Sequence, residues 1–371
     1  MKTASHLWPE LVSWPNMLLA LQRCRRRKRY STAAAEFDYD SMNNLLHLQR
    51  ELVEDYWFPG PYYHFHITDP KPRKISAAPF RDRIVHHAIV NVLEPVFEPR
   101  FIFDSYACRR GKGTHKAILR AQQYLRRYSW SLKTDIVKFF PSIDHELLLQ
   151  RICRTIRDPK VIKLVSTIID SGQGVLADEY IPSFFPGDDL FAQLRPRGLP
   201  IGNLTSQFFA NVYLDSLDHY IREELRVPGY VRYADDLVLF GRSRQDMWNY
   251  RQSIADFAAS LRLRLHAHKT HVSPCTMPLN FLGMRISRHE LRLRNSGIRR
   301  FTRRIRHLQM RLDNGKSGYS DVQNSLRAWM AHCGHANTKG LIRDLLKRLR
   351  FRRRSAHRIT PAAVTRQNCS K

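Results

Sequence analysis

Residues 230–240 of the chain read Tyr-Val-Arg-Tyr-Ala-Asp-Asp-Leu-Val-Leu-Phe. Apolar and β-branched residues alternate on both sides of the pair Asp235-Asp236, which predicts two short strands joined by a tight turn. Burying an isolated charge is costly, so carboxylates in such a position are usually paired or bound to a metal ion. Acidic pairs are also common in ordinary hairpin turns, and the rest of the sequence must therefore decide between the two interpretations.

A third carboxylate, Asp135, lies 100 residues upstream of Asp235. The surrounding residues 130–140 are rich in aromatic and β-branched side chains, which predicts a buried strand with Asp135 in its middle. Only a folded sheet can bring this residue to the Asp235-Asp236 turn. A pair of catalytic divalent ions, about 3.5–4 Å apart, requires carboxylates from adjacent strands. The three residues are therefore the predicted catalytic and metal-binding site.

The charge of the chain indicates a polyanionic partner. Its 371 residues include 62 Lys and Arg against 33 Asp and Glu, giving a formal net charge of +29. Phosphates neutralise such an excess and release counterions on binding. An acidic protein or an anionic membrane would also suit a basic chain. Because the charge is spread along the whole sequence, we favour nucleic acid.

Several classes of protein are disfavoured by composition. No run of about 18 apolar residues is present, and Met1 to Gln22 lacks the apolar region of a signal peptide, so we expect a cytoplasmic protein. The six cysteines show no Cys-x-x-Cys spacing, which argues against a zinc knuckle or a disulfide framework. They are expected to be buried or free thiols.

Periodicity outlines the secondary structure. Helices are expected over 41–56, 80–97, 203–225 and 245–265, with Asp144 as the N-cap of another. Strands are expected over 62–67 and 73–77, and a further hairpin over 280–286 and 290–294. Residues 171–197 are rich in Gly, Pro and Asp and predict a surface insertion. A basic helical region over 296–351 is expected to break near Gly315 and Gly318.

Four segments occur in the order typical of one enzyme family. Residues 71–75 read Lys-Pro-Arg-Lys-Ile, residues 135–144 read Asp-Ile-Val-Lys-Phe-Phe-Pro-Ser-Ile-Asp, residues 233–236 read Tyr-Ala-Asp-Asp, and residues 280–286 read Asn-Phe-Leu-Gly-Met-Arg-Ile. Together they resemble the motifs of reverse transcriptases, over roughly residues 50–345. The resemblance implies an RNA-directed DNA polymerase of the α+β class. The implied fold is a right hand of fingers, palm and thumb, with a mixed antiparallel palm sheet and a helical thumb.

The resemblance also divides the chain. It implies a basic N-terminal extension (1–40), fingers (41–100), the first part of the palm with adjoining fingers helices (101–170), the surface insertion (171–197), the second part of the palm (198–295), the thumb (296–355) and a basic tail (356–371).

Site residues follow from the same motifs. The resemblance implies two Mg²⁺ ions, replaceable by Mn²⁺, held by Asp135, the backbone carbonyl of Ile136 and Asp235, with Asp236 in electrostatic support. The implied dNTP-binding residues are Arg73, Phe140, Ile201, Gly202 and Gln207, of which Phe140 would exclude a ribose 2′-hydroxyl. The implied nucleic-acid contacts are Arg81, Arg83, Tyr233, Gly283 and Arg285. The implied partners are template RNA, a DNA or RNA primer, and dNTPs.

Residues 198–207, Gly-Leu-Pro-Ile-Gly-Asn-Leu-Thr-Ser-Gln, depart from most of the family, which has Gln-Gly at 201–202 and Ser-Pro at 206–207. This version resembles the enzymes of bacterial and phage diversity-generating retroelements, which are related to group II intron reverse transcriptases. Ile201 replaces a hydrogen-bonding amide by an apolar surface, which weakens selectivity that rests on polar contacts. The resemblance implies error-prone synthesis at template adenines during mutagenic retrohoming, with an oligomeric accessory variability protein as partner.

Two alternatives stay open. One is a reverse transcriptase of another bacterial group, defence-associated or group II intron-like, although no maturase or endonuclease extension is expected. The other is a catalytically inactive RNA-binding scaffold, which the three intact aspartates disfavour. The histidines at 332 and 335, with Cys333 between them, do not have the spacing of a usual zinc site. His86 and His87 are adjacent on a helix and cannot share a face.

Overall fold

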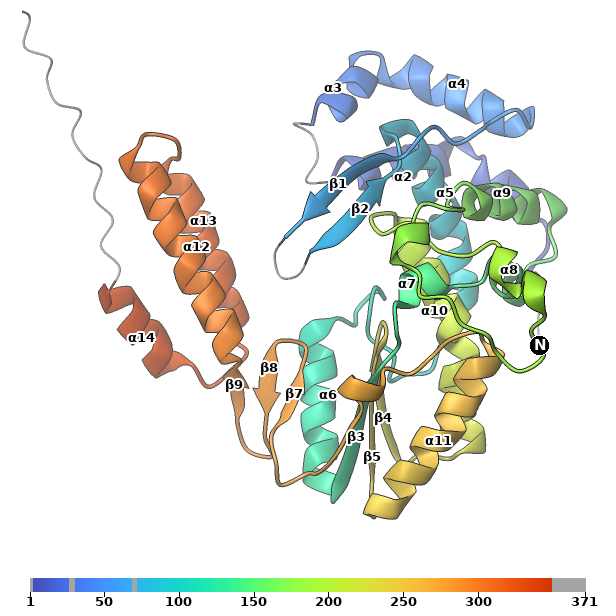
Figure 1. Cartoon of the computed structure of the whole chain (residues 1–371). Coiled ribbons are helices and arrows are strands. Elements are labelled where there is room, and N and C mark those ends of the chain that lie inside the picture. Colours follow the sequence, from blue (N-terminus) through green and yellow to red (C-terminus); the bar gives the residue numbers. More distant parts are fainter. Residues whose placement is uncertain (1–2, 27–30, 69–71, 349–371) are drawn as a thin grey trace, which may run out of the picture. The chain divides into compact units, whose positions relative to one another are not determined.

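The computed structural model describes residues 3–26, 31–68 and 72–348 and divides after Met277 into two compact units (Figure 1). Each unit is described by itself. Part of the basic run near residue 27, residues 69–71 between the two predicted strands, the end of the last predicted helix at 349–351 and the predicted tail 356–371 lie outside the described residues.

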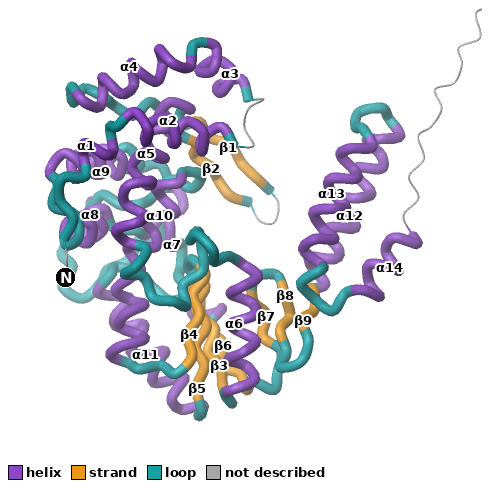
Figure 2. The backbone as a smooth tube through the Cα atoms, turned by 180° about the vertical axis from the view of Figure 1, so that it is seen from behind, coloured by secondary structure: helices purple, strands orange, loops and turns teal. Residues whose placement is uncertain are grey.

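The first unit contains a four-stranded antiparallel sheet in the order β4-β5-β3-β6. Its strands are β3 (Trp130–Asp135), β4 (Gly229–Tyr233), β5 (Asp236–Gly241) and β6 (His271–Pro274). The sheet lies between the helices α6 (Thr114–Arg127) and α11 (Arg244–Ser260), as Figure 2 shows. The alternating pattern around residue 235 predicted the hairpin β4–β5, and the structure confirms it.

The strand predicted over 130–140 is too long by five residues. β3 ends at Asp135, and Lys138 then adopts a left-handed conformation (φ 45°) that leads into the short helix α7 (Phe139–Ser142). The aspartate is therefore the last residue of its strand and not its centre. This position leaves its carboxylate at the end of the sheet, where Asp235 and Asp236 also lie.

The remaining part of the first unit is mainly helical. Its helices are α1 (Trp8–Leu11), α2 (Trp14–Arg25), α3 (Thr32–Tyr39), α4 (Ser41–Val53), α5 (Phe80–Phe97), α8 (His145–Cys153), α9 (Pro159–Asp170) and α10 (Leu204–His219). A π-helical turn, η3 (Tyr220–Glu224), continues α10. Asp144 caps α8 as predicted, because its Oδ1 accepts a hydrogen bond from the Leu147 amide at 3.0 Å.

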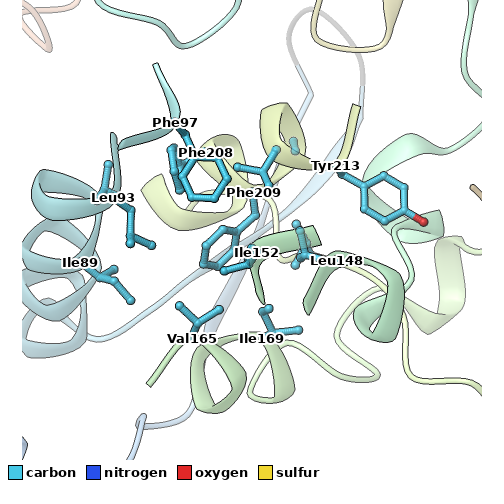
Figure 3. Close-up of a cluster of buried hydrophobic side chains, with 14 of the residues drawn as sticks. Ile89, Leu93, Phe97, Leu148, Ile152, Val165, Ile169, Phe208, Phe209 and Tyr213 are labelled. Carbon is cyan, nitrogen blue, oxygen red and sulfur yellow. The ribbon is translucent and has the colours of Figure 1, made fainter. Parts of the chain in front are cut away.

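One apolar core joins these helices. Figure 3 shows side chains of α5, α8, α9 and α10 meeting in it, among them Leu93, Ile152, Val165 and Phe209. Helix α2 packs along α5 and buries five residues, Asn16, Met17, Ala20, Leu21 and Cys24. The N-terminal segment 1–40, expected as an extension, thus contributes the three helices α1, α2 and α3 to the folded unit.

Two connecting segments complete the first unit. The strands β1 (Tyr63–Ile67) and β2 (Arg73–Ala77) form the predicted antiparallel hairpin. Residues 171–197 contain only short 3₁₀ turns, η1 (Ala177–Glu179) and η2 (Leu190–Leu194), in agreement with the predicted loop. A third 3₁₀ turn, η4 (Ala267–Lys269), precedes β6.

The second unit combines a small sheet with helices. Its strands are β7 (Leu279–Phe281), β8 (Met284–Ile286) and β9 (Leu291–Leu293), so the region predicted as one hairpin is a three-stranded meander. The helices are α12 (Asn295–Asp313), α13 (Tyr319–Cys333) and α14 (Lys339–Arg348). Phe301 stacks on Trp329 at 4.0 Å and ties α12 to α13. The structural boundary after Met277 groups the strands with the helices, whereas the predicted division placed them apart.

Two expectations from composition can be checked. No helix within the described ranges is long and apolar enough to cross a membrane. Within the described ranges, the cysteines at 24, 108, 153, 275 and 333 are thiols outside any disulfide, as predicted, and three of them are buried.

Candidate active site

Three carboxylates meet at one end of the four-stranded sheet. Asp135 at the end of β3 pairs in register with Asp236 at the start of β5. Asp235 lies in the turn between β4 and β5, and its carbonyl accepts a hydrogen bond from the Ile136 amide at 3.3 Å. The carboxyl groups of Asp135 and Asp235 are within hydrogen-bonding reach of each other. The structure thus brings together three residues that are up to 101 positions apart, 135 to 236, in the sequence.

A buried ion pair stabilises the turn that carries Asp235. Arg232, fully buried in β4, makes a bidentate pair with Asp218 of α10, which is also fully buried. The same guanidinium donates to the carbonyl of Ala234 at 3.3 Å. Ala234 has a φ of 53°, a conformation that residues with a Cβ seldom adopt. We infer that Arg232 is a positioning residue for the aspartate turn.

Burial, together with repulsion between the carboxylates, raises the pKa values at this site. Burial, followed by the charges of Asp135 and Asp236, raises the pKa of Asp235 to about 7. Burial likewise raises the pKa of Asp236, although Lys133, 3.5 Å away, opposes the shift. Lys269 forms an ion pair with Asp135. Cations therefore already lie against two of the three carboxylates.

The donor set suits a hard divalent ion. Carboxylate oxygens are the ligands that Mg²⁺ prefers, and the repulsion that raises the pKa of Asp235 is what a bound cation would relieve. As the side chains lie here, no group of three or more His, Cys, Asp or Glu in the described part of the chain is arranged to hold a metal ion. Lys269, which no sequence pattern singled out, would have to leave Asp135 before that oxygen could bind one.

Several predicted dNTP-binding residues form a connected second group. The Ser76 amide of β2 donates to the Ile201 carbonyl at 2.8 Å. Gly202 has a φ of 133°, and a Cβ there would lie 3.0 Å from Ile75 and 3.2 Å from the Ser76 carbonyl. Only glycine allows this close approach. The exposed Arg73 begins the same strand.

The residues just before Ile201 connect this group of predicted dNTP-binding residues to α7. The Leu199 amide donates to the Phe140 carbonyl at 2.9 Å, and the Gly198 amide donates to the Ile143 carbonyl at 2.8 Å. Phe140 is half-buried and packs edge-on against Phe139, which is 2% exposed. This difference in burial agrees with a core role for Phe139 and leaves part of Phe140 available to a ligand.

The predicted nucleic-acid contacts lie in different environments. Arg81 forms an ion pair with Glu51, and Arg83 donates to the Ala78 carbonyl at 2.6 Å. The hydroxyl of Tyr233 accepts a hydrogen bond from Thr114 at 3.0 Å. The other two belong to the second unit: Gly283 lies in the β7–β8 turn, and Arg285 is exposed on β8. Gln207, which was predicted to bind dNTP, is exposed on α10.

The histidine pairs do not form a metal site among the described residues. His86 is 1% exposed, and burial lowers its pKa to about 3, so it is a neutral core residue. Cys333, between His332 and His335, is buried.

The buried network around Asp218 gives a pH prediction. Burial and the charge of Asp218 raise the pKa of Asp215 from 3.8 to about 6, although His219 opposes the shift. The folded chain therefore holds this proton more tightly than the unfolded chain, and stability falls as the pH rises from about 4 to about 6. Asp215→Asn should be more stable than the wild type by about 1–2 kcal/mol at pH 7 and equal to it below pH 4.

Urea unfolding between pH 4 and pH 8 measures this difference. Asp256→Asn, an exposed change on α11, is the control and should show no such trend. A less stable Asp215→Asn protein at pH 7 would mean that the contact with His219 outweighs burial.

Comparison with known proteins identifies a family whose match includes the sheet and the three aspartates. The model of the family "Reverse transcriptase (RNA-dependent DNA polymerase)" matches residues 68–286, more than half of the chain. The protein is therefore an RNA-directed DNA polymerase by class. It belongs to the reverse transcriptase family.

Individual relatives point toward group II introns. The chain is 25% identical to protein YkfC of Escherichia coli over 66% of its own length and 71% of that protein. It is 22% identical to the group II intron-encoded protein LtrA of Lactococcus lactis, over 67% of this chain and 49% of LtrA. It is 27% identical to nuclear intron maturase 2 of Arabidopsis thaliana, over 45% of this chain and 25% of the maturase. The chain thus spans half or less of the intron proteins.

Proposed function

We propose that the chain copies an RNA template into cDNA by two-metal nucleotidyl transfer at Asp135, Asp235 and Asp236. The observation that carries the proposal is the meeting of these carboxylates at the sheet end, with the pKa of Asp235 raised to about 7. The proposed architecture is a right hand, in which the four-stranded sheet belongs to the palm, β1–β2 to the fingers and α12–α13 to the thumb.

The proposed mechanism gives each group a role. Asp135 and Asp235 hold the ions with the Ile136 carbonyl, and Asp236 adds negative charge. Divalent ions supply activation of the primer 3′-hydroxyl and neutralisation of the triphosphate. Arg73 binds the triphosphate, and the exposed part of Phe140 excludes a 2′-hydroxyl. Gly202 allows backbone to approach the nascent base pair. The 3′-oxygen forms a bond to the α-phosphorus as the bond to pyrophosphate breaks.

Primer extension on a homopolymer RNA template tests the activity. Incorporation of dNTPs that depends on Mg²⁺ or Mn²⁺ is the expected result, and RNA binding without any incorporation would favour the inactive scaffold. The partners required by this proposal are template RNA, a primer and dNTPs.

We further propose that the enzyme is error-prone at template adenines and serves a diversity-generating retroelement, with an oligomeric accessory variability protein. The support is Ile201, whose partly buried side chain replaces an amide in a segment bonded to β2. Without a polar group there, discrimination must rest on shape, which separates similar ligands weakly.

Ile201→Gln should lower misincorporation opposite template adenine by roughly tenfold, because it restores a polar contact whose loss relaxes selectivity. Sequencing of cDNA made on a defined RNA measures the error at each template base. Ile181→Gln, in the 171–197 segment, makes the same change at an exposed position and is the control. An unchanged error spectrum for Ile201→Gln removes the proposal of low fidelity and leaves the polymerase activity intact.

A second candidate is a group II intron-like reverse transcriptase, which the names of the relatives LtrA and nuclear intron maturase 2 favour. Faithful copying opposite adenine, together with preferential binding of an intron RNA, would support it over the retroelement enzyme.

A further inference from the structure

A pocket lies at the other end of the catalytic sheet. Its volume is about 430 Å³, within the usual range of small-ligand sites. β5 runs from Asp236 to Gly241, which lines the pocket, so five residue steps of about 3.4 Å place it about 17 Å from the carboxylates. The pocket is therefore separate from the proposed active site.

Three arginines from three different segments line this pocket. Arg127 is the last residue of α6, Arg226 follows η3, and Arg242 follows β5. All three are exposed, and no ion pair neutralises any of them within the described part of the chain. Asp246 supplies the single carboxylate of the lining. The net charge of the pocket is thus positive, and a phosphate would complement it.

The conformation of Arg226 is unusual for its position. It has a φ of 48° where the chain leaves η3, and the next residue, Val227, donates to the Ile221 carbonyl at 3.1 Å. Glycine is the common residue in a left-handed helix end, because a Cβ is unfavourable there. Helix termination alone therefore does not account for an arginine at this position.

Hydrogen bonds and close packing hold the backbone that lines the pocket in place. The Tyr128 hydroxyl donates to the Pro228 carbonyl at 3.0 Å, and the Ser129 amide donates to the Gly241 carbonyl at 3.1 Å. A Cβ at Gly241 would lie 2.4 Å from Met247. Tyr250 adds a partly buried ring to the wall. Guanidinium groups beside aromatic rings are typical of sites that hold single-stranded nucleic acid.

We propose that Arg127, Arg226 and Arg242 form a second phosphate-binding site, which holds the backbone of a single-stranded RNA outside the active site. The choice of RNA rests on the proposed function. Two more exposed arginines, Arg126 and Arg244, lie within two residues of pocket arginines in the sequence, and a polynucleotide, unlike a single phosphate, offers several charges to such a basic region.

The test uses the full chain and two RNAs. One is a short primer–template duplex, and the other carries a single-stranded extension of about 30 nucleotides. The double variant Arg226→Gly/Arg242→Ala should bind the extended RNA about tenfold more weakly. The slope of log affinity against log salt concentration should also become less steep, by about one to two. Its affinity for the short duplex, and its kcat and KM for dNTPs on that duplex, should match the wild type.

Two controls separate binding from folding and from charge. Arg226→Gly alone should melt no lower than the wild type, because glycine suits the positive φ. Arg157→Ala changes an exposed arginine between α8 and α9 and should weaken extended-RNA binding by less than twofold. An equal loss for the double variant and for Arg157→Ala would overturn the site.

A competing ligand is tested directly. If ATP binds the wild type and not the double variant while extended-RNA binding is unchanged, the phosphate belongs to a free nucleotide and the RNA assignment is wrong. Loss of polymerase activity in Asp235→Asn leaves this binding test unaffected, so failure of the proposed function and failure of the second site are distinguishable.

Discussion

Asp235→Asn should reduce primer extension on the order of 10³-fold or more, because the amide removes a charged ligand from the proposed metal site. The same change should raise stability without divalent metal by about 1–2 kcal/mol, since it removes a carboxylate that burial and two neighbouring charges destabilise. Addition of Mg²⁺ should raise the melting temperature of the wild type and leave that of the variant unchanged.

Primer extension and thermal melting with and without Mg²⁺ measure both effects. Asp256→Asn makes the same chemical change on the exposed face of α11 and should behave like the wild type. An Asp235→Asn protein that keeps its activity would contradict the assignment of the catalytic carboxylates. A variant that is inactive and also much less stable would instead point to a structural role for Asp235.

Asp218→Asn should destabilise the protein by about 3–5 kcal/mol, because it leaves the charge of the fully buried Arg232 uncompensated. The network also includes Tyr230, whose hydroxyl donates to Asp218 at 2.8 Å. Polymerase activity should fall as well, since Arg232 donates to the Ala234 carbonyl in the aspartate turn.

Urea unfolding with an activity assay at a temperature where the variant is folded separates the two effects. The matched control is Asp55→Asn. Asp55 forms an ion pair with Lys163, and the side chains of both residues are more than half exposed. That pair should contribute less than about 1 kcal/mol. Equal destabilisation by the two changes would show that burial does not govern the cost at Asp218.

The hairpin predicted over residues 230–240, which the structure extends to 229–241, could be recognised because its alternating pattern and acidic turn are local signals. The strand of Asp135 was predicted too long because apolar residues continue past it, and only the left-handed Lys138 ends the strand. Periodicity cannot reveal a backbone conformation of this kind.

Partners distant in sequence were missed for a related reason. Lys269 and Asp135 are 134 residues apart and lie in segments with no shared pattern. Arg232 looked like one more polar position in an alternating strand, yet it is completely buried. The one available signal was a charged residue on the apolar side of the strand, and that signal does not identify Asp218 as its partner. Long-range ion pairs become visible only when the fold brings their elements together.

The hydrogen bonds along residues 198–203 have a mechanical consequence. This segment bonds to α7 through Leu199 and to β2 through Ile201, and the Asn203 side chain accepts a hydrogen bond from the Ala78 amide at 3.2 Å. A shift of the β1–β2 hairpin would therefore be transmitted through residues 198–203 to α7, which contains Phe140. If Ile201 takes part in the choice of base and Phe140 in the choice of sugar, as proposed, a substitution that alters one choice should also disturb the other, because residues 198–203 link the two positions through hydrogen bonds.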